Sequence, residues 1–80
     1  MAMTPLKDVK LGAIVRLDLQ EYGFATIRKI NDDGSLQAFR PYISCADFSC
    51  GNSVITYIGH EDFAIHGENV DMVRQGPDLK

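Results

Sequence analysis

The chain has 80 residues, of which 45% are hydrophobic and 24% charged, and its formal net charge is −3. This length supports one domain, and the apolar content is too high for a disordered chain. The acidic balance disfavours nucleic-acid binding, which normally depends on a basic surplus. Because no apolar stretch is long enough for a membrane span and the N-terminus lacks a signal-peptide core, we expect a cytoplasmic protein with no membrane contact.

Residues 1–8 read as a lead-in to the folded domain. Thr4 and Pro5 are the residue types of a helix N-cap and first helical position, so they predict a short helical turn, which Gly12 ends. The first strand is expected over residues 13–19, because its apolar and polar side chains alternate with a period of two.

The middle of the chain carries a hairpin signal. A second strand, Phe24–Ile30, is followed by Asn-Asp-Asp-Gly at 31–34, which supplies a glycine for positive φ and short acids that cap their own turn. The third strand should therefore return over residues 35–39. Pro41 cannot donate to a ladder, so this strand should end there and give way to a loop over residues 43–52.

The last third of the chain predicts a fourth strand over residues 53–58 and a short extended piece over 63–65. A tight 3-10 turn at 67–69 should then precede a last strand over 70–74, and residues 75–80 should form a flexible tail. No helical pattern is long enough to cover a sheet, so the sheet must close on itself. We therefore predict a single all-β domain, a five-stranded barrel over about residues 9–74.

Three stretches carry a resemblance to SH3-like barrels. Residues 9–17 (Val-Lys-Leu-Gly-Ala-Ile-Val-Arg-Leu) resemble the opening strand of that class. Residues 23–27 (Gly-Phe-Ala-Thr-Ile) and 65–73 (Ile-His-Gly-Glu-Asn-Val-Asp-Met-Val) resemble the second strand and the closing segment of Tudor-type barrels. This resemblance implies the fold more than a function. The chain has no tryptophan and no Ala-Leu-Tyr-Asp-Tyr signature, so the proline-peptide groove of signalling SH3 domains is not implied.

A narrower resemblance concerns the type II dihydrofolate reductases, tiny SH3-like barrels that act as tetramers around a pore. Their pore segment reads Val-Gln-Ile-Tyr, and Ser-Val-Ile-Thr-Tyr at residues 53–57 is similar. Ile55 stands in place of the glutamine whose amide addresses cofactor and substrate, and an apolar side chain offers no such hydrogen bonds. We therefore expect no cofactor. In size and style the chain also resembles products of phages and mobile gene cassettes.

Four side chains could ligate a metal: Cys45, Cys50, His60 and His66. Their spacing is looser than the paired Cys-x-x-Cys of structural zinc sites, so free thiols or a redox-active or bridged pair remain alternatives, and no metal is expected. The polar run 60–62 is typical of a solvated turn. No catalytic residue is therefore predicted.

Two further groups of side chains are candidates for ligand binding. Four aromatic residues lie near loops, where Tudor-type barrels build cages for methylated cations: Tyr22, Phe24, Tyr42 and Phe48. Three arginines lie on successive strands and could form one cationic row for phosphate or carboxylate: Arg16, Arg28 and Arg40. Packing under the 43–52 loop and neutralisation by neighbouring acids are the respective alternatives.

The fourth strand differs from a half-solvated strand, because four apolar side chains occupy both of its faces: Val54, Ile55, Tyr57 and Ile58. Either the cysteine-containing loop or another subunit must cover the second face. We predict a homo-oligomeric binding module that uses this strand as its interface and contacts a protein partner. The alternative is a barrel that binds a small molecule or nucleotide, with any enzymatic site formed between subunits.

Overall fold

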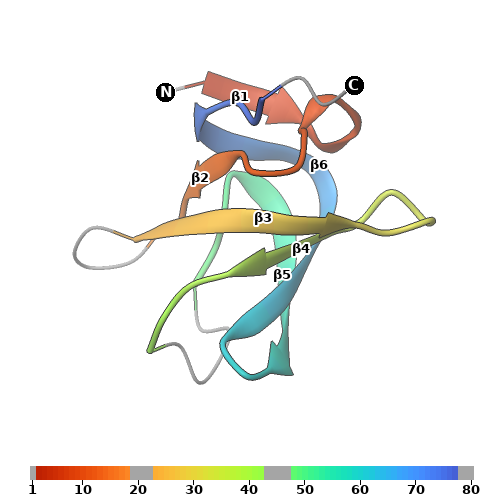
Figure 1. Ribbon diagram of the computed structural model, residues 1–80. Helices are drawn as coiled ribbons and strands as arrows, with labels where there is room; N and C mark the ends of the chain where they lie inside the picture. The colour runs from red at the N-terminus through yellow and green to blue at the C-terminus, as the bar shows by residue number, and fades with distance from the viewer. Residues whose placement is uncertain (1, 19–22, 43–47, 78–80) are drawn as a thin grey trace.

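The structure is a computed structural model that describes residues 2–18, 23–42 and 48–77 (Figure 1). These residues form six strands and one 3-10 turn: β1 (Ala2–Pro5), η1 (Leu6–Asp8), β2 (Ile14–Arg16), β3 (Phe24–Ile30), β4 (Leu36–Phe39), β5 (Asn52–Gly59) and β6 (Asp62–Arg74). All strand pairs are antiparallel. The predicted all-β class and the N-terminal turn are confirmed.

Four strands close a small barrel. β2 pairs with β3, β3 with β4, β4 with β6, and β6 with β2, which completes the ring. The remaining two strands, β1 and β5, each pair with β6 outside this ring. The architecture is thus a closed ring of four strands with two additional strands, so the predicted count of five strands in the barrel is wrong.

The long strand β6 organises both sides of the barrel. Ile65 pairs with β4 and also with β5, so these two strands lie along opposite edges of β6. Met72 pairs with β1 and also with β2, and Asn69 pairs with both β1 and β5. One edge of β6 therefore carries β4 and then β1, whereas the other edge carries β5 and then β2.

The predicted 3-10 turn at 67–69 and the separate strands around it are wrong, because β6 runs without interruption for 13 residues. Ser53 pairs with Gly67 whereas Asn52 pairs with Asn69, so Glu68 is an extra residue in a β-bulge. Gly67 adopts φ +127°, a conformation that a residue with a Cβ rarely adopts. The glycine that suggested a turn thus bends the strand within its ladder.

The lead-in is also more ordered than expected. Residues 2–5 form β1 against residues 69–72, and Pro5, not Thr4, occupies the N-cap of η1 without a side-chain capping bond. At the other end, the Gln75 side chain accepts a hydrogen bond from the Lys10 N–H at 3.0 Å and donates one to the Asp8 carbonyl at 2.8 Å. These bonds attach the start of the predicted tail to the segment after η1, and residues 78–80 lie outside the described residues.

The core follows from strand alternation. On β2 and β3 the buried side chains are every second residue, as the sequence predicts for the segments around Val15 and Ile27. The largest fully buried side chains come from β2, β3, β4 and β6 and from the segment before β5: Phe63, Ile27, Leu36, Ile65, Val15, Val70 and Cys50. This core fixes which face of each strand is left to solvent.

Candidate functional site

β5 is a border strand of the sheet. Among the described residues it pairs only with β6, so the backbone groups along its other edge have no strand partner. Its side chains alternate: Ile55 packs against the core, whereas Val54 and Ile58 point outward and are 66% and 56% exposed. The prediction of apolar residues on both faces of this strand is therefore met, with one face uncovered by the described chain.

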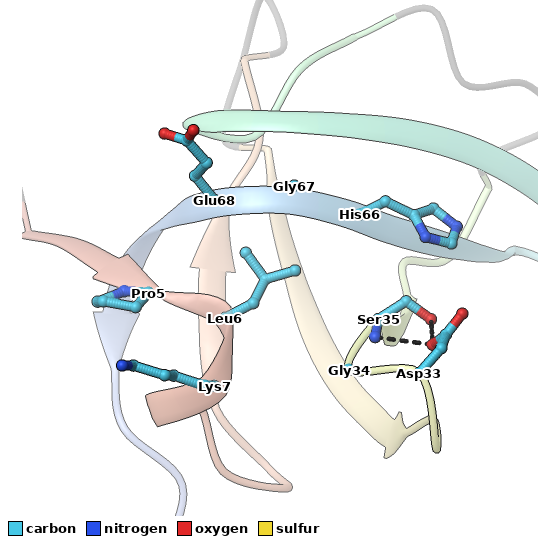
Figure 2. A pocket seen from close by; sticks show the side chains of 9 residues that line it. All are labelled: Pro5, Leu6, Lys7, Asp33, Gly34, Ser35, His66, Gly67 and Glu68. Carbon is cyan, nitrogen blue, oxygen red and sulfur yellow. Dashed lines mark hydrogen bonds between the residues drawn. The ribbon is translucent and has the colours of Figure 1, made fainter.

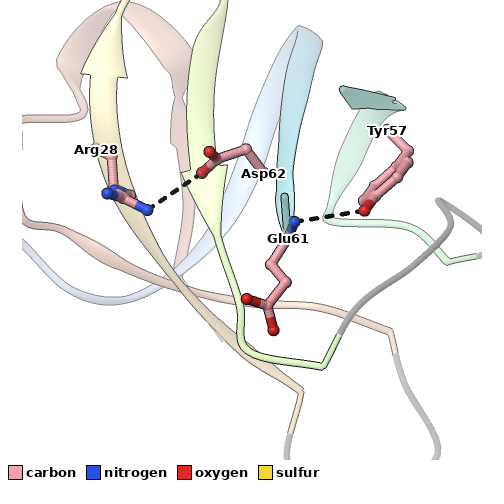
Figure 3. Close-up of polar contacts among 4 residues, drawn as sticks. All are labelled: Arg28, Tyr57, Glu61 and Asp62. Carbon is pink, nitrogen blue, oxygen red and sulfur yellow. Dashed lines mark hydrogen bonds and ion pairs between the residues drawn. The ribbon is translucent and has the colours of Figure 1, made fainter. Parts of the chain in front are cut away.

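The far end of β5 is held by the turn that follows it. The Tyr57 hydroxyl accepts a hydrogen bond from the Glu61 N–H at 3.4 Å (Figure 3). His60 and Glu61 both have positive φ, and the Glu61 carbonyl also accepts a bond from the Arg40 N–H at 3.1 Å. Tyr57 is thus half-buried and oriented, which leaves Val54, Thr56 and Ile58 as the exposed row of β5.

The described end of the 43–52 loop packs inward. Phe48 meets the buried Phe63 edge to face, with ring centroids 5.2 Å apart, and Cys50 is fully buried. The Ser53 hydroxyl donates to the Cys50 carbonyl. These contacts place the end of the loop on the core side of the barrel wall, away from the outward row of β5. Residues 43–47 lie outside the described residues.

The three predicted arginines lie on one outward face, together with two phenylalanines. We call this surface the arginine face; it comprises Arg16, Phe24, Arg28, Phe39 and Arg40. The Arg16 guanidinium lies 5.7 Å from the centre of the Phe24 ring, and that of Arg28 lies 4.6 Å from the Phe39 ring. The Arg40 Nη1 donates to the Phe24 carbonyl at 3.1 Å.

In the described part of the chain, one carboxylate forms an ion pair with the arginine face. Asp62 Oδ1 lies 3.5 Å from the Arg28 Nη1 (Figure 3), and the Arg28 side chain remains 53% exposed. This ion pair links β3 to the start of β6 and partly neutralises the row of arginines. Among the described residues, no ion pair to a carboxylate is seen for Arg16 or Arg40, so two of the three arginines keep donors for an external anion.

A cleft of about 470 Å³ opens beside β6, on the edge where pairing passes from β4 to β1. The last pair with β4 is at Ile65 and the first pair with β1 is at Asn69, so residues 66–68 border the gap. Figure 2 shows η1 on one side of the cleft and the 31–35 turn on the other. The lining residues are Pro5, Leu6, Lys7, Asp33, Gly34, Ser35, His66, Gly67 and Glu68.

The turn that borders this cleft holds a carboxylate in its charged form. The Ser35 hydroxyl donates to Asp33 Oδ1 at 2.6 Å, and the Ser35 N–H donates to the same oxygen at 2.9 Å (Figure 2). Both bonds lower the pKa of Asp33 below its ordinary value, and the bond from the Ser35 hydroxyl has the larger effect. Of the metal-ligand candidates that the structure describes, only His66 borders this cleft, and the gap in pairing that forms the cleft has no signature in the sequence.

The predicted aromatic residues are spread over both sides of the barrel wall. Phe24 lies outward under Arg16, Phe48 packs inward on Phe63, and Tyr42 is 98% exposed with φ +66°. Tyr22 lies outside the described residues. Phe24 and Phe48 therefore do not face a common cage.

The metal-ligand candidates are likewise separated. Cys50 is a buried free thiol, His60 lies in the β5–β6 turn and His66 is exposed on β6, whereas Cys45 lies outside the described residues. Burial raises the pKa of the Cys50 thiol, so the thiol stays protonated. Within residues 2–18, 23–42 and 48–77, no three His, Cys, Asp or Glu side chains gather as a metal site.

Searches against known protein families, characterised proteins and solved structures give no match to this chain. In the described part of the chain, no helix combines the length and apolar character needed to cross a membrane.

Proposed function

We propose that this protein is a non-enzymatic interaction module of the cytoplasm, a variant of the SH3-like barrel that assembles with a second copy through β5 and also contacts a protein partner. The observation that carries the proposal is the edge of β5 that pairs with no strand in the described part of the chain, beside an exposed apolar row. An unpaired strand edge is a template for pairing with another strand. A core of this size also supplies only about 3–5 kcal/mol, which assembly would supplement.

The composition of β5 supports a role in assembly. Proteins protect unused strand edges with charged residues, proline or very short strands. β5 is eight residues long, and Asn52–Gly59 contains no charged residue and no proline. β5 therefore has none of these three protective features, and its edge that has no partner among the described residues is suited to pairing with another strand.

The sequence of β5 also favours one register for a symmetric pair. In an antiparallel pair related by a two-fold axis at Thr56, Val54 of each copy lies opposite Ile58 of the other, and Ile55 lies opposite Tyr57. Moving the axis to Ile55 would instead place Val54 opposite Thr56. The register centred on Thr56 matches apolar residues on both faces, so the occupant that fits β5 best is β5 itself.

Light scattering of three forms of the protein tests this proposal. We expect a dimeric or larger mass for the unchanged chain and a monomeric mass for Ile58→Lys, because the substitution replaces the apolar contact with Val54 of the other copy by a charge on the strand edge. Ile30→Lys is the matched control, since Ile30 is an equally apolar residue, 44% exposed on β3. A monomeric mass for the unchanged chain at micromolar concentration, or a dimer that survives Ile58→Lys, would refute assembly through β5.

A second candidate function rests on the cleft beside η1. Its volume of about 470 Å³ is within the range of small-molecule sites, about 300–1,000 Å³, and it combines apolar Pro5 and Leu6 with charged residues of both signs. A thermal-shift screen with nucleotides and common cofactors tests this alternative. Stabilisation that is lost in His66→Ala would support it, whereas no stabilisation by any compound would reject it for those ligands.

A further inference from the structure

We propose that the arginine face binds an acidic segment of a partner protein. This surface lies on β2, β3, β4 and the residue after β4, Arg40, whereas the proposed self-assembly uses β5, so the two interactions use different parts of the barrel. The proposal rests on the proposed contact with a protein partner and specifies the chemistry of that partner, and its residues differ from those proposed for self-assembly.

The arginines are held in place before any ligand arrives. Arg16 and Phe24 are directly paired across β2 and β3, and Phe39 is paired with Thr26 across β3 and β4. Each ring thus supports a guanidinium group from the same outward face, at 5.7 Å for Arg16 and 4.6 Å for Arg28. A stacked guanidinium group loses less rotational freedom on binding, and its planar edge still offers donors that match a carboxylate.

The local charge of this face opposes that of the whole molecule. The arginine face itself carries three positive charges and no carboxylate, and Asp62 is its ion-pair partner among the described residues, whereas the full chain carries −3. Because the Arg28–Asp62 pair is exposed and 3.5 Å apart, it is weak, and an incoming carboxylate can compete for the outer donors of Arg28. The face is therefore a cationic area on an acidic protein, which is complementary to a segment rich in Asp and Glu.

Two features favour an acidic protein segment over a nucleic acid. Proteins that bind single-stranded nucleic acids offer open aromatic faces to the bases, whereas here a guanidinium group lies over each of the two Phe rings. The net charge of −3 repels any polyanion at distances beyond the face itself, so a short acidic segment that contacts only this face is favoured over a long polyphosphate.

Fluorescence anisotropy with three labelled probes tests the proposal: decaglutamate, decaglutamine and an oligothymidylate of about ten phosphates. We expect decaglutamate to bind at low ionic strength, its affinity to fall as salt is added, and decaglutamine not to bind. Amide NMR shifts on adding decaglutamate should concentrate in β2, β3 and β4. No binding of decaglutamate, or equal or tighter binding of oligothymidylate, would overturn the proposal.

Two substitutions localise the effect. Arg16→Ala and Arg28→Ala should each weaken decaglutamate binding about threefold to tenfold, the range for one charged hydrogen-bonding group on a surface. Lys10→Ala is the control, because it removes the same charge from the segment between η1 and β2, outside the arginine face, and should leave the affinity within about twofold. Circular dichroism checks that each variant folds. An equal loss in all three variants would mean that net charge alone attracts the probe, and this result would also overturn the proposal.

Discussion

The contact between Phe48 and Phe63 places the described end of the 43–52 loop on the core side of β5, and a double-mutant cycle can measure this contact. Phe63 is fully buried, and Phe48 meets it edge to face at 5.2 Å. Replacing a buried Phe by Ala costs about 3–5 kcal/mol, as much as the whole stability expected for this domain. Leu is the better probe, because Phe63→Leu should cost about 1–2 kcal/mol and leave a folded protein.

The quantity of interest is the coupling between the two rings. An edge-to-face pair contributes about 0.5–1.5 kcal/mol beyond the area that it buries, so Phe48→Leu and Phe63→Leu together should cost less than the sum of the separate changes by that amount. Urea unfolding followed by circular dichroism, at one fixed protein concentration, provides the free energies. Phe24→Leu combined with Phe63→Leu is the control, since Phe24 lies on the outward face.

One outcome of the double-mutant cycle would refute the contact between Phe48 and Phe63. If the coupling between positions 48 and 63 is no larger than that of the control pair, the loop does not pack inward as described. The reasoning that leaves the outward row of β5 free for a second copy would then lose its support.

Three other predictions concern single sites. Gly76→Ala should lower the free energy of unfolding by about 1–3 kcal/mol, because a Cβ there would lie 2.0 Å from the Leu11 carbonyl oxygen; urea unfolding checks this. Because burial raises the pKa of the Cys50 thiol above 9.0, the folded protein holds its proton longer than the unfolded chain, so stability should fall as pH rises above about 9, and Cys50→Ala should reduce this fall in pH-dependent unfolding. Ser35→Ala should raise the pKa of Asp33 toward 3.8, which carboxyl NMR titration detects; an unchanged pKa would contradict the bonding described.

The sequence predicted those parts of the fold that depend on neighbours along the chain. Strands around Val15 and Ile27 show clear alternation, and Asn31–Gly34 carries the chemistry of a hairpin turn, with the Gly34 N–H bonded to the Asn31 carbonyl at 3.0 Å. β1 was missed because four residues are too few to show a period and its partner lies at the other end of the chain. The sequence predicted two short strands in place of β6, because a glycine such as Gly67 is equally typical of a turn and of a bulge within a strand.

The candidate sites likewise combine features that the sequence predicts with features that depend on the three-dimensional pairing. The outward positions of Arg16 and Arg28 follow from alternation within β2 and β3, whereas Arg40 lies after the end of β4 and reaches this face through its bond to the Phe24 carbonyl. The stacking of the first two arginines on Phe24 and Phe39 depends on the register between strands, which the sequence does not specify. The cleft depends on where β4 ends and β1 begins along one edge of β6, which only the three-dimensional pairing reveals.

Disulfide cross-linking at Thr56 tests the central claim most directly, namely that two copies pair through β5 about this residue. In the proposed pair, the Cα atoms of the two Thr56 residues are about 4.5–5.5 Å apart, within disulfide range. Thr56→Cys in a Cys45→Ser background should therefore form a covalent dimer under mild oxidation, seen on a non-reducing gel, whereas Thr26→Cys, on the outward face of β3, should not. A Thr56→Cys protein that stays monomeric, or that cross-links no faster than Thr26→Cys, would contradict the account.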